Sequence, residues 1–320
     1  MIFRGAWVAV MRTCLVLGGT GFIGSHIVQA LIEDGWHIRI LTRRISVGRT
    51  VSHPNVSLIE GDFEHSAVIS DALDGCCACV HSLTATTPES ANNDPIFDIQ
   101  ANVIPTARLM SILAERAIDK FVFISSGGTV YGPAQYLPID EDHPTRPFIS
   151  YAVTKLAIEQ LLEVYRIERR LNYTILRVSN PFGECQRVES KVGAAAAFMD
   201  NIIHDRPITI WGDGSAVRDY VYVGDVARAV VAGLHYSGQS RVFNVGSGVG
   251  RNLIELIRQI EDVVGKKSTL HFTKGRRIDI PTNVLNISRA KKELHWEPVV
   301  PFQEGLRRLY DWFNGNGDTA

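Results

Sequence analysis

A tyrosine and a lysine four residues apart are the pair in this sequence whose types and spacing best suit acid–base chemistry. Tyr151 and Lys155 lie in Ser-Tyr-Ala-Val-Thr-Lys, and this spacing places both side chains on one face of a helix. A tyrosine hydroxyl is a weak base at neutral pH, but nearby positive charge favours the phenolate. The pair therefore predicts a catalytic site, and an ordinary surface helix is the alternative.

Hydroxyl groups at the end of a predicted strand extend this candidate site. The strand expected at 120–125 leads into Ser-Ser-Gly-Gly-Thr-Val-Tyr-Gly at 125–132. The carboxyl ends of parallel strands are where ligands bind in open α/β sheets. We expect Ser126 or Thr129 to hydrogen-bond the reacting oxygen of the substrate.

A glycine-rich turn near the start of the chain predicts a dinucleotide site. It lies between a strand expected at 12–17 and a helix that runs to about Asp34. Its glycines permit a tight turn and close approach of the backbone to a pyrophosphate, and the helix N-terminus supplies N–H groups and a positive dipole. A simple loop is the alternative. The predicted cofactor-binding residues are Gly18, Thr20, Gly21, Phe22, Ile23 and Gly24.

The residues after the next two predicted strands bear on which dinucleotide binds. The second strand ends in Thr42-Arg43-Arg44, without the acid that would bind a free ribose 2′-hydroxyl. Guanidinium groups suit a 2′-phosphate, so the local chemistry slightly favours NADP, and both NAD and NADP stay open. Asp62, beside Phe63, is placed to bind the adenine amino group; an ordinary turn aspartate is the alternative.

Strands and helices alternate along most of the chain. Strands are expected at 12–17, 37–41, 56–59, 78–82, 120–125 and 173–178, with long helices at 95–116 and 151–170. The alternation predicts an α/β fold, a doubly wound parallel Rossmann sheet with a smaller C-terminal α/β substrate lobe. We expect the dinucleotide-binding domain at 11–180 with returns near 218–250, the lobe at 181–217 and 251–314, and an extension at 1–10.

Composition excludes several classes of partner. The 320 residues are 45% hydrophobic and 21% charged, with a net charge of -1, which argues against a nucleic-acid partner. No apolar run approaches the ~18 residues of a membrane span, and we expect no membrane partner and a cytoplasmic protein. The cluster Cys76, Cys77 and Cys79 lacks a second ligand pair at zinc spacing, so no metal is expected.

Five segments together resemble the extended short-chain dehydrogenase/reductase family, and within it the UDP-galactose 4-epimerase branch of the NAD-dependent epimerase/dehydratases. They occur in family order over nearly the whole chain from Arg12. The segments are Gly-Gly-Thr-Gly-Phe-Ile-Gly-Ser-His at 18–26, Ser-Ser-Gly-Gly-Thr-Val-Tyr-Gly at 125–132, the Tyr151/Lys155 pair, Leu-Arg-Val-Ser-Asn-Pro-Phe-Gly at 176–183 and Arg-Asp-Tyr-Val-Tyr-Val-Gly-Asp-Val-Ala at 218–227.

The resemblance implies further site residues. Asn102 would lie beside the cofactor and Asn180 beside the diphosphate of a nucleotide sugar, while Ile210 and Trp211 would border the uracil. Arg218 and Arg276 would contact the diphosphate, which arginine binds bidentately, although surface ion pairs are the alternative for both.

Asn283 falls where residue size gates N-acetylated sugars in the family that the chain resembles. Asparagine is small, so room for an N-acetylhexosamine is expected. Two departures from the family pattern also matter. Gly127 occupies the usual place of a catalytic Ser or Thr, which leaves Ser126 or Thr129 to substitute, and the adjacent positions lack the Asp-Glu pair of the dehydratases.

The function expected from these features is 4-epimerisation of a UDP-hexose or UDP-N-acetylhexosamine. Phenolate Tyr151 would remove the proton of the sugar 4-hydroxyl while the C4 hydride passes to the nicotinamide, and both would return after the 4-ketone turns over. An NADPH-dependent 4-ketosugar reductase is the first alternative, and a non-catalytic dinucleotide sensor is the second. The two long helices could pair in a homodimer.

Overall fold

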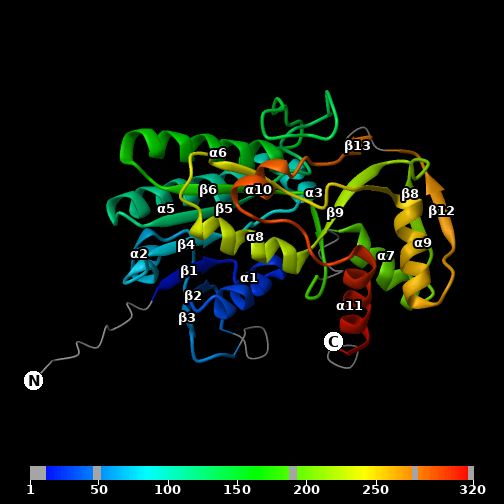
Figure 1. Ribbon diagram of the computed structural model, residues 1–320, viewed down its shortest axis with the longest axis horizontal. Helices are drawn as coiled ribbons and strands as arrows, with labels where there is room; N and C mark the ends of the chain where they lie inside the picture. The colour runs from blue at the N-terminus through cyan, green and yellow to red at the C-terminus, as the bar shows by residue number, and fades with distance from the viewer. Residues whose placement is uncertain (1–11, 46–51, 187–192, 276–279, 316–320) are drawn as a thin grey trace, which may run out of the picture.

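Seven parallel strands form the centre of the molecule (Figure 1). The computed structural model describes residues 12–45, 52–186, 193–275 and 280–315, so the extension predicted at 1–10 lies outside the described residues. The strand order is β10-β6-β5-β4-β1-β2-β3. The strands are β1 (Thr13–Leu17), β2 (His37–Thr42), β3 (Val56–Glu60), β4 (Ala78–His81), β5 (Lys120–Ser126), β6 (Tyr173–Val178) and β10 (Val242–Val245).

These strands form because their short apolar runs are buried on both faces of the sheet. In β1, Cys14 and Val16 belong to one hydrophobic cluster, whereas Leu15 and Leu17 belong to another. Successive side chains of a strand point to opposite faces, so the two clusters lie on the two sides of the sheet. The predicted doubly wound parallel sheet is confirmed.

Helices cover both faces of this sheet (Figure 1). Helices α1 (Phe22–Glu33) and α8 (Val223–His235) pack on the face that holds Cys14 and Val16. Helices α2 (Ser66–Leu73), α5 (Ile104–Glu115) and α6 (Ser150–Arg169) pack on the other face. The order of the strands reverses between β1 and β4, and such a switch point is where open α/β sheets bind ligands.

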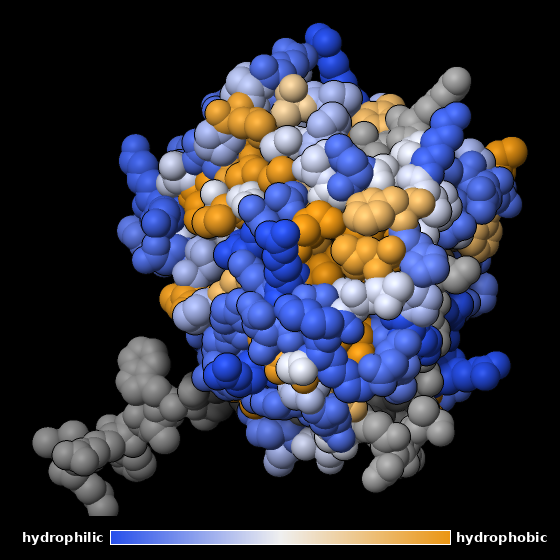
Figure 2. All heavy atoms as spheres, turned by 90° about the vertical axis from the view of Figure 1, so that its right-hand side faces the viewer, coloured by the Kyte–Doolittle hydropathy of each residue, from blue (hydrophilic) through white to orange (hydrophobic). Residues whose placement is uncertain are grey.

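The later part of the chain builds smaller sheets and helices beside the carboxyl edge. Strands β7 (Asn180–Phe182), β9 (Val217–Tyr222), β11 (Gly250–Asn252) and β13 (Thr282–Asn283) form one sheet, and β8 (Ile208–Trp211) pairs with β12 (Leu270–Thr273). Helices α7 (Ala194–Ile203), α9 (Leu253–Val264) and α11 (Phe302–Gly315) share a hydrophobic cluster with these strands. Figure 2 faces this lobe, where hydrophobic residues gather in the middle of a mostly hydrophilic surface.

The long helix predicted at 95–116 is not uniform. It consists of α4 (Pro95–Asp98), a π-helical segment η1 (Ile99–Val103) and α5, and a separate short helix α3 (Pro88–Asn93) precedes it. Pro105 has no N–H to donate within the helix. The Ile104 N–H instead binds the Ile99 carbonyl, and the Thr106 hydroxyl donates to the Asn102 carbonyl at 2.6 Å. The helical turn around Asn102 therefore contains one residue more than an α-helical turn.

Among the described residues, no helix is long and apolar enough to span a membrane, and no group of three or more His, Cys, Asp or Glu could hold a metal. Helix α10 (Ser288–Glu293) contacts β10 at the edge of the main sheet.

Candidate active site

The glycine-rich turn has the geometry of a phosphate cradle. Gly18 has a φ of +83°, and a Cβ on Gly24 would lie 1.9 Å from the Gly18 carbonyl oxygen. The turn with Thr20 and Gly21 leads into α1, whose N-terminus no side chain caps, so the first N–H groups of the helix, at Phe22 and Ile23, have no side-chain acceptor. The turn therefore fits a dinucleotide, because its closely packed backbone leaves helix N–H groups for the phosphates.

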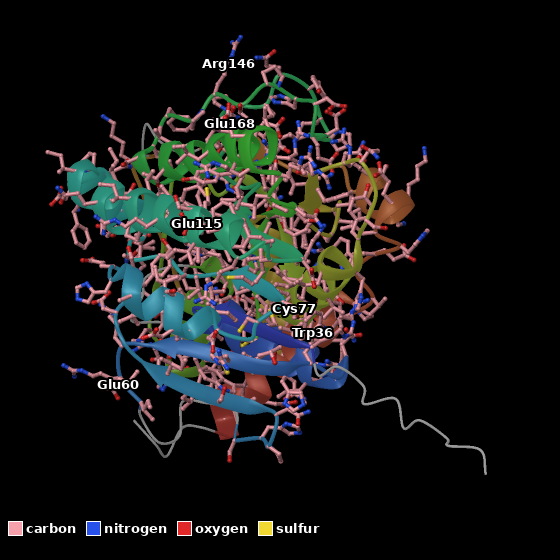
Figure 3. The ribbon with its side chains drawn as sticks, turned by 90° about the vertical axis from the view of Figure 1, so that its left-hand side faces the viewer. Trp36, Glu60, Cys77, Glu115, Arg146 and Glu168 are labelled. Carbon is pink, nitrogen blue, oxygen red and sulfur yellow. The ribbon has the colours of Figure 1, made fainter. Side chains whose placement is uncertain are left out.

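The end of β2 combines basic and acidic groups. Arg43 and Arg44 are exposed, and the Thr42 hydroxyl donates to the Arg44 carbonyl at 3.0 Å. Glu60 pairs with Thr42 in the register of β2 and β3, and its carboxylate accepts from the Ile45 N–H at 3.3 Å. Figure 3 shows Glu60 at the outer part of the sheet, away from α5 and α6. The acid that β2 lacks is thus supplied nearby by β3.

The residues after β3 divide between a turn and a pocket. The Asp62 carboxylate accepts from the Glu64 N–H at 2.9 Å through one of its two oxygens, a contact that is compatible with an ordinary turn and with binding of an adenine amino group. Phe63 is buried, and its ring meets the His81 ring edge to face at 5.3 Å between centroids. Phe63 therefore belongs to the wall of the candidate site.

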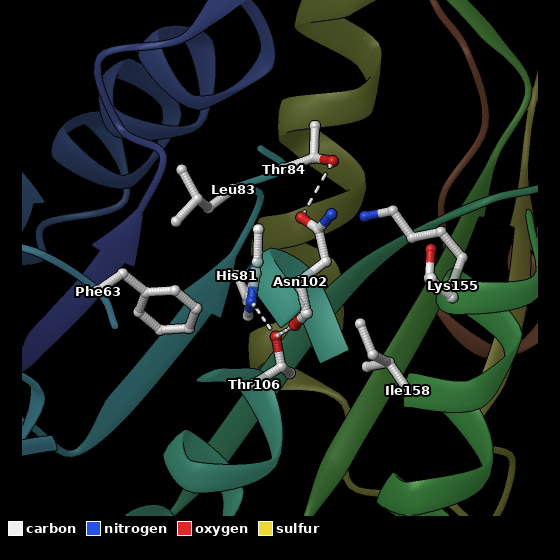
Figure 4. Close-up of a pocket in the computed structure, with 10 residues that line it drawn as sticks. Phe63, His81, Leu83, Thr84, Asn102, Thr106, Lys155 and Ile158 are labelled. Carbon is white, nitrogen blue, oxygen red and sulfur yellow. Dashed lines mark hydrogen bonds between the residues drawn. The ribbon is translucent and has the colours of Figure 1, made fainter. Parts of the chain in front are cut away.

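A pocket at the switch point brings the predicted Asn102 and Lys155 together (Figure 4). Their side chains point toward one another across it. Asn102 Oδ1 accepts from the Ala85 N–H at 2.9 Å, and Asn102 Nδ2 donates to Asp98 Oδ1 at 2.9 Å. Both ends of the Asn102 side chain are therefore fixed. The pocket is lined by Phe63, His81, Leu83, Thr84, Ala101, Asn102, Thr106, Thr154, Lys155 and Ile158.

Lys155 is buried with its ammonium bound to the protein. Its Nζ donates to the Ile124 carbonyl at 2.9 Å and lies 4.8 Å from the centre of the Phe123 ring. Burial lowers the pKa of Lys155 to about 8, while Glu159 and Asp98 oppose that shift. The lysine thus lies in a pocket where the charged ammonium depends on neighbouring carboxylates.

Tyr151 is a phenol in this environment. Burial and then the Asp98 carboxylate raise the pKa of Tyr151 to about 12. The positive charge of Lys155, which was expected to favour the phenolate, does not offset these two effects in the chain alone. The reason is geometric: the ammonium binds the Ile124 carbonyl and lies 5.8 Å from the centre of the tyrosine ring. The chain's own residues therefore keep the proton on Tyr151.

The loop after β5 distinguishes between the two candidate hydroxyls. Thr129 Oγ1 donates to Ser126 Oγ at 2.9 Å, which occupies the threonine proton and leaves the serine proton free. A Cβ on Gly127 would lie 2.7 Å from Leu285 Cδ1 and 2.8 Å from the Arg177 carbonyl oxygen. The loop has no room for a side chain at Gly127, and Ser126 is the better placed donor.

Three predicted substrate-binding residues come from neighbouring strands of the lobe sheet. Asn180 is on β7 and Arg218 on β9, and Asn283 of β13 pairs with Arg218 in register. Asn283 is fully buried, and its amide donates to the Gly127 carbonyl at 3.1 Å. The sheet therefore connects these residues to the loop after β5. Arg276 lies outside the described residues.

The two residues predicted to border the base do not share a face. Ile210 is 1% exposed within the lobe core, and Trp211 is 48% exposed. Consecutive residues of a strand point to opposite sides, so only Trp211 presents its side chain at the surface.

Two buried carboxylates near the site were not among the predicted residues. Asp98 lies four positions before Asn102, and Glu159 lies four positions after Lys155, so helical spacing could have indicated both. Glu159 forms a buried ion pair with Arg177 at 2.6 Å. The Arg177 guanidinium in turn lies 4.9 Å from the centre of the Tyr131 ring.

The strand order reverses, the glycine turn has no side-chain cap, and Tyr151 lies one turn before the buried Lys155 on α6. Together these features define a dinucleotide-dependent enzyme with a Rossmann sheet. The model of the NAD dependent epimerase/dehydratase family matches residues 14–246, and the chain belongs to that family. The predicted family resemblance and the prediction of an enzyme are confirmed.

Relatives cover almost the whole chain. A UDP-glucose 4-epimerase of Mycolicibacterium smegmatis is 33% identical over 310 residues, which are 95% of this chain and 98% of the relative. A dTDP-4-dehydro-6-deoxyglucose reductase of Escherichia coli is 32% identical over 305 residues, 92% of this chain and 95% of the relative. The crystal structure of a Thermotoga maritima UDP-glucose 4-epimerase with UDP-glucose superposes with a TM-score of 0.91, at 29% identity, over 96% of this chain and 100% of the other.

Proposed function

We propose that the protein is a UDP-sugar 4-epimerase that works through tightly bound NAD. The observation that carries this proposal is the pocket that gathers Asn102 and Lys155 at the switch point, with Tyr151 on the same helix as Lys155. The full-length similarity to 4-epimerases agrees with it and favours it over the non-catalytic sensor.

Bound NAD would supply the acceptor and donor for the C4 hydride. The glycine turn would hold its phosphates, and Asn102 and Lys155 would orient its nicotinamide half. Tyr151 takes the proton of the sugar 4-hydroxyl and later returns it, while Ser126 donates a hydrogen bond to the same oxygen. Because the pKa of Tyr151 is about 12 in the chain alone, proton removal requires further positive charge beside the phenol.

The substrate diphosphate lies against Asn180, Arg218 and Arg276 in this proposal, with the base at Trp211 and the backbone of Ile210. Asn283, held by the Gly127 carbonyl, places a small side chain beside the sugar. We expect room for an N-acetylhexosamine. Binding of UDP-glucose together with exclusion of UDP-N-acetylglucosamine would contradict this part of the proposal.

NAD is favoured over NADP by one feature of the structure. Glu60 reaches the end of β2 from β3, and a carboxylate there opposes a 2′-phosphate while it can bind a free 2′-hydroxyl. Arg43 and Arg44 favour NADP. Mass spectrometry of the nucleotide released by denaturation decides between them; NADP together with net reduction of a 4-ketosugar nucleotide would support the reductase, which the similarity to a named reductase keeps as a second candidate.

A homodimer through α5 and α6 is part of the proposal. Val164 and Ile167 on α6 are 51% and 64% exposed, and Figure 3 shows Glu115 of α5 and Glu168 of α6 on neighbouring helices. Helices that expose large hydrophobic side chains commonly pair in symmetric dimers. The proposed location is the cytoplasm.

The test of the proposed function is conversion of a UDP-sugar without added cofactor. Purified protein is incubated with UDP-glucose or UDP-N-acetylglucosamine, and the C4 epimer is measured by chromatography. Formation of the epimer at substoichiometric enzyme supports the epimerase. Absence of the epimer from both sugars, with oxidation of added NADPH by a 4-ketosugar nucleotide, contradicts it.

A further inference from the structure

Asp98 is a carboxylate with no exposed surface, next to Asn102 and Thr154 of the pocket. Its Oδ1 accepts from Thr86 Oγ1 at 2.6 Å and from Asn102 Nδ2 at 2.9 Å. Its Oδ2 accepts from Ser150 Oγ at 2.9 Å and from Thr154 Oγ1 at 3.2 Å. Within the described part of the chain it forms no ion pair, so neutral donors alone satisfy a buried negative charge.

The two oxygens of Asp98 bind different parts of the site. Oδ1 holds the π-helical segment that carries Asn102, whereas Oδ2 holds the first turn of α6. Ser150 and Thr154 flank Tyr151 on that turn, and Thr154 also donates to the Tyr151 carbonyl at 2.9 Å. The carboxylate therefore links the residue beside the cofactor site to the residue that exchanges protons.

The charge of Asp98 acts on the same residues. Burial raises the pKa of Tyr151, and the Asp98 carboxylate raises it further. Burial lowers the pKa of Lys155, while Glu159 and then Asp98 raise it. His81 is neutral, because burial and then Lys155 lower its pKa to about 3. Glu89 and Asp94 are exposed. The ionisable groups of the elements around Asp98 include Tyr151, Lys155 and Glu159 of α6, His81 of β4, Glu89 of α3 and Asp94 before α4.

We propose that Asp98 is a positioning residue of the active site, whose carboxylate fixes Tyr151 relative to Asn102 and whose negative charge opposes loss of the Tyr151 proton. The inference rests on the proposed function where activity is the readout. It makes Asp98 the group that sets the pH at which the enzyme becomes active, although its side chain has no exposed surface.

The variant Asp98→Asn removes the charge and keeps the shape. Ser150 and Thr154 carry hydroxyls, which can turn to accept from the new amide, so the fold has a way to satisfy the substitution. Because the phenolate forms more easily without the buried anion, we expect the acidic limb of the kcat–pH profile to move by at least about half a pH unit to lower pH.

Asp94→Asn is the matched control. Asp94 is exposed and caps the start of α4 by accepting from the Phe97 N–H, a role that asparagine fills equally well. It removes the same charge four residues away, and we expect an unchanged pH profile. A folded Asp98→Asn protein whose acidic limb stays where the wild type has it would overturn the proposal, even if its melting temperature falls.

Ser150→Ala tests the positioning role separately. It also serves as the test of the proposal in case the Asp98→Asn protein does not fold. It keeps the charge and removes one hydrogen bond to α6. We expect kcat to fall at least about fivefold, with the acidic limb unmoved and KM within about twofold, since an unmade buried hydrogen bond is worth about 1 kcal/mol or more. A smaller loss of kcat contradicts the positioning role.

A readout without substrate separates this inference from the proposed function. The ionisation of Tyr151 is measured by the ultraviolet absorbance of phenolate, as the difference between each protein and its Tyr151→Phe counterpart. If the proposal holds, Tyr151 ionises at a lower pH in Asp98→Asn than in the wild type. If the wild type converts no UDP-sugar, the proposed function fails, while this titration still supports or overturns the role of Asp98.

Discussion

Tyr151 is the residue on which the proposed chemistry depends most. Its hydroxyl is the only group of the predicted catalytic pair that can take a substrate proton, because Lys155 already donates to the Ile124 carbonyl. Tyr151→Phe removes this acid–base group without changing the helix. We expect kcat to fall about 10²- to 10⁴-fold, with the dissociation constant for the UDP-sugar within about twofold.

Tyr165→Phe is the control on the same helix. Its hydroxyl contacts Ser111 Oγ of α5 at 2.6 Å, and neither residue lines the pocket that holds Lys155. Steady-state kinetics and calorimetric binding on both variants separate catalysis from binding. A Tyr151→Phe enzyme with at least a tenth of wild-type kcat would contradict the assigned role.

The ion pair of Glu159 and Arg177 is the interaction whose loss should most reduce stability. Both side chains are buried, at 2% and 7% exposure, and Ser125 also donates to Glu159. Glu159→Gln leaves the guanidinium uncompensated, which for a buried pair costs about 3 to 5 kcal/mol of unfolding free energy. Urea titration followed by circular dichroism measures it.

Glu304→Gln gives the comparison for an exposed pair. Glu304 binds Arg308 at 2.9 Å with both side chains more than 40% exposed, and such pairs contribute about 0 to 1 kcal/mol. Equal losses in the two variants would mean that burial does not govern the contribution of Glu159.

At the scale of elements, the glycine turn and α1 form one unit. A methyl group on Gly24 would overlap the Gly18 carbonyl, so Gly24→Ala has to separate the turn from the helix. We expect loss of bound dinucleotide, measured by mass after denaturation. Gly315→Ala, in the last turn of α11 with open space around it, should retain wild-type occupancy. Full occupancy in Gly24→Ala would show that this turn does not hold the phosphates.

The alternation of strands and helices was readable from the sequence because buried parallel strands are short apolar runs. The predicted strands at 37–41, 120–125 and 173–178 match β2, β5 and β6 closely. The π-helical segment was not predicted, since Pro105 identifies a missing N–H but not how the neighbouring carbonyls are satisfied. The structure shows that the Thr106 hydroxyl donates to the Asn102 backbone carbonyl, a contact that the sequence alone does not indicate.

The site was predictable where chemistry follows from local spacing and not where it depends on distant strands. Tyr151, Lys155 and the glycine turn could be predicted because four-residue and strand–turn–helix patterns are local. Glu60 was missed because it reaches the end of β2 from β3. The raised pKa of Tyr151 was missed because it comes from burial and then from Asp98, which approaches α6 from another helix.

At the scale of the whole molecule, the exposed apolar face of α6 predicts self-association. Ile167 is 64% exposed on α6, and Val299 is 61% exposed elsewhere on the surface. Ile167→Glu should convert a dimer to a monomer because a charge in an apolar interface is costly, whereas Val299→Glu should not. Analytical ultracentrifugation measures both. A wild type that sediments as a monomer would contradict the proposed dimer.

The central claim is that the whole molecule oxidises and re-reduces one carbon without releasing its cofactor. UDP-glucose deuterated at C4 tests it most directly, with nuclear magnetic resonance and mass spectrometry of the product formed without added NAD. We predict a C4 epimer that retains the deuterium at C4, because the same hydride leaves and returns. An epimer that has exchanged its deuterium with water would contradict this claim. So would the absence of any epimer together with NADPH-dependent reduction of a 4-ketosugar nucleotide.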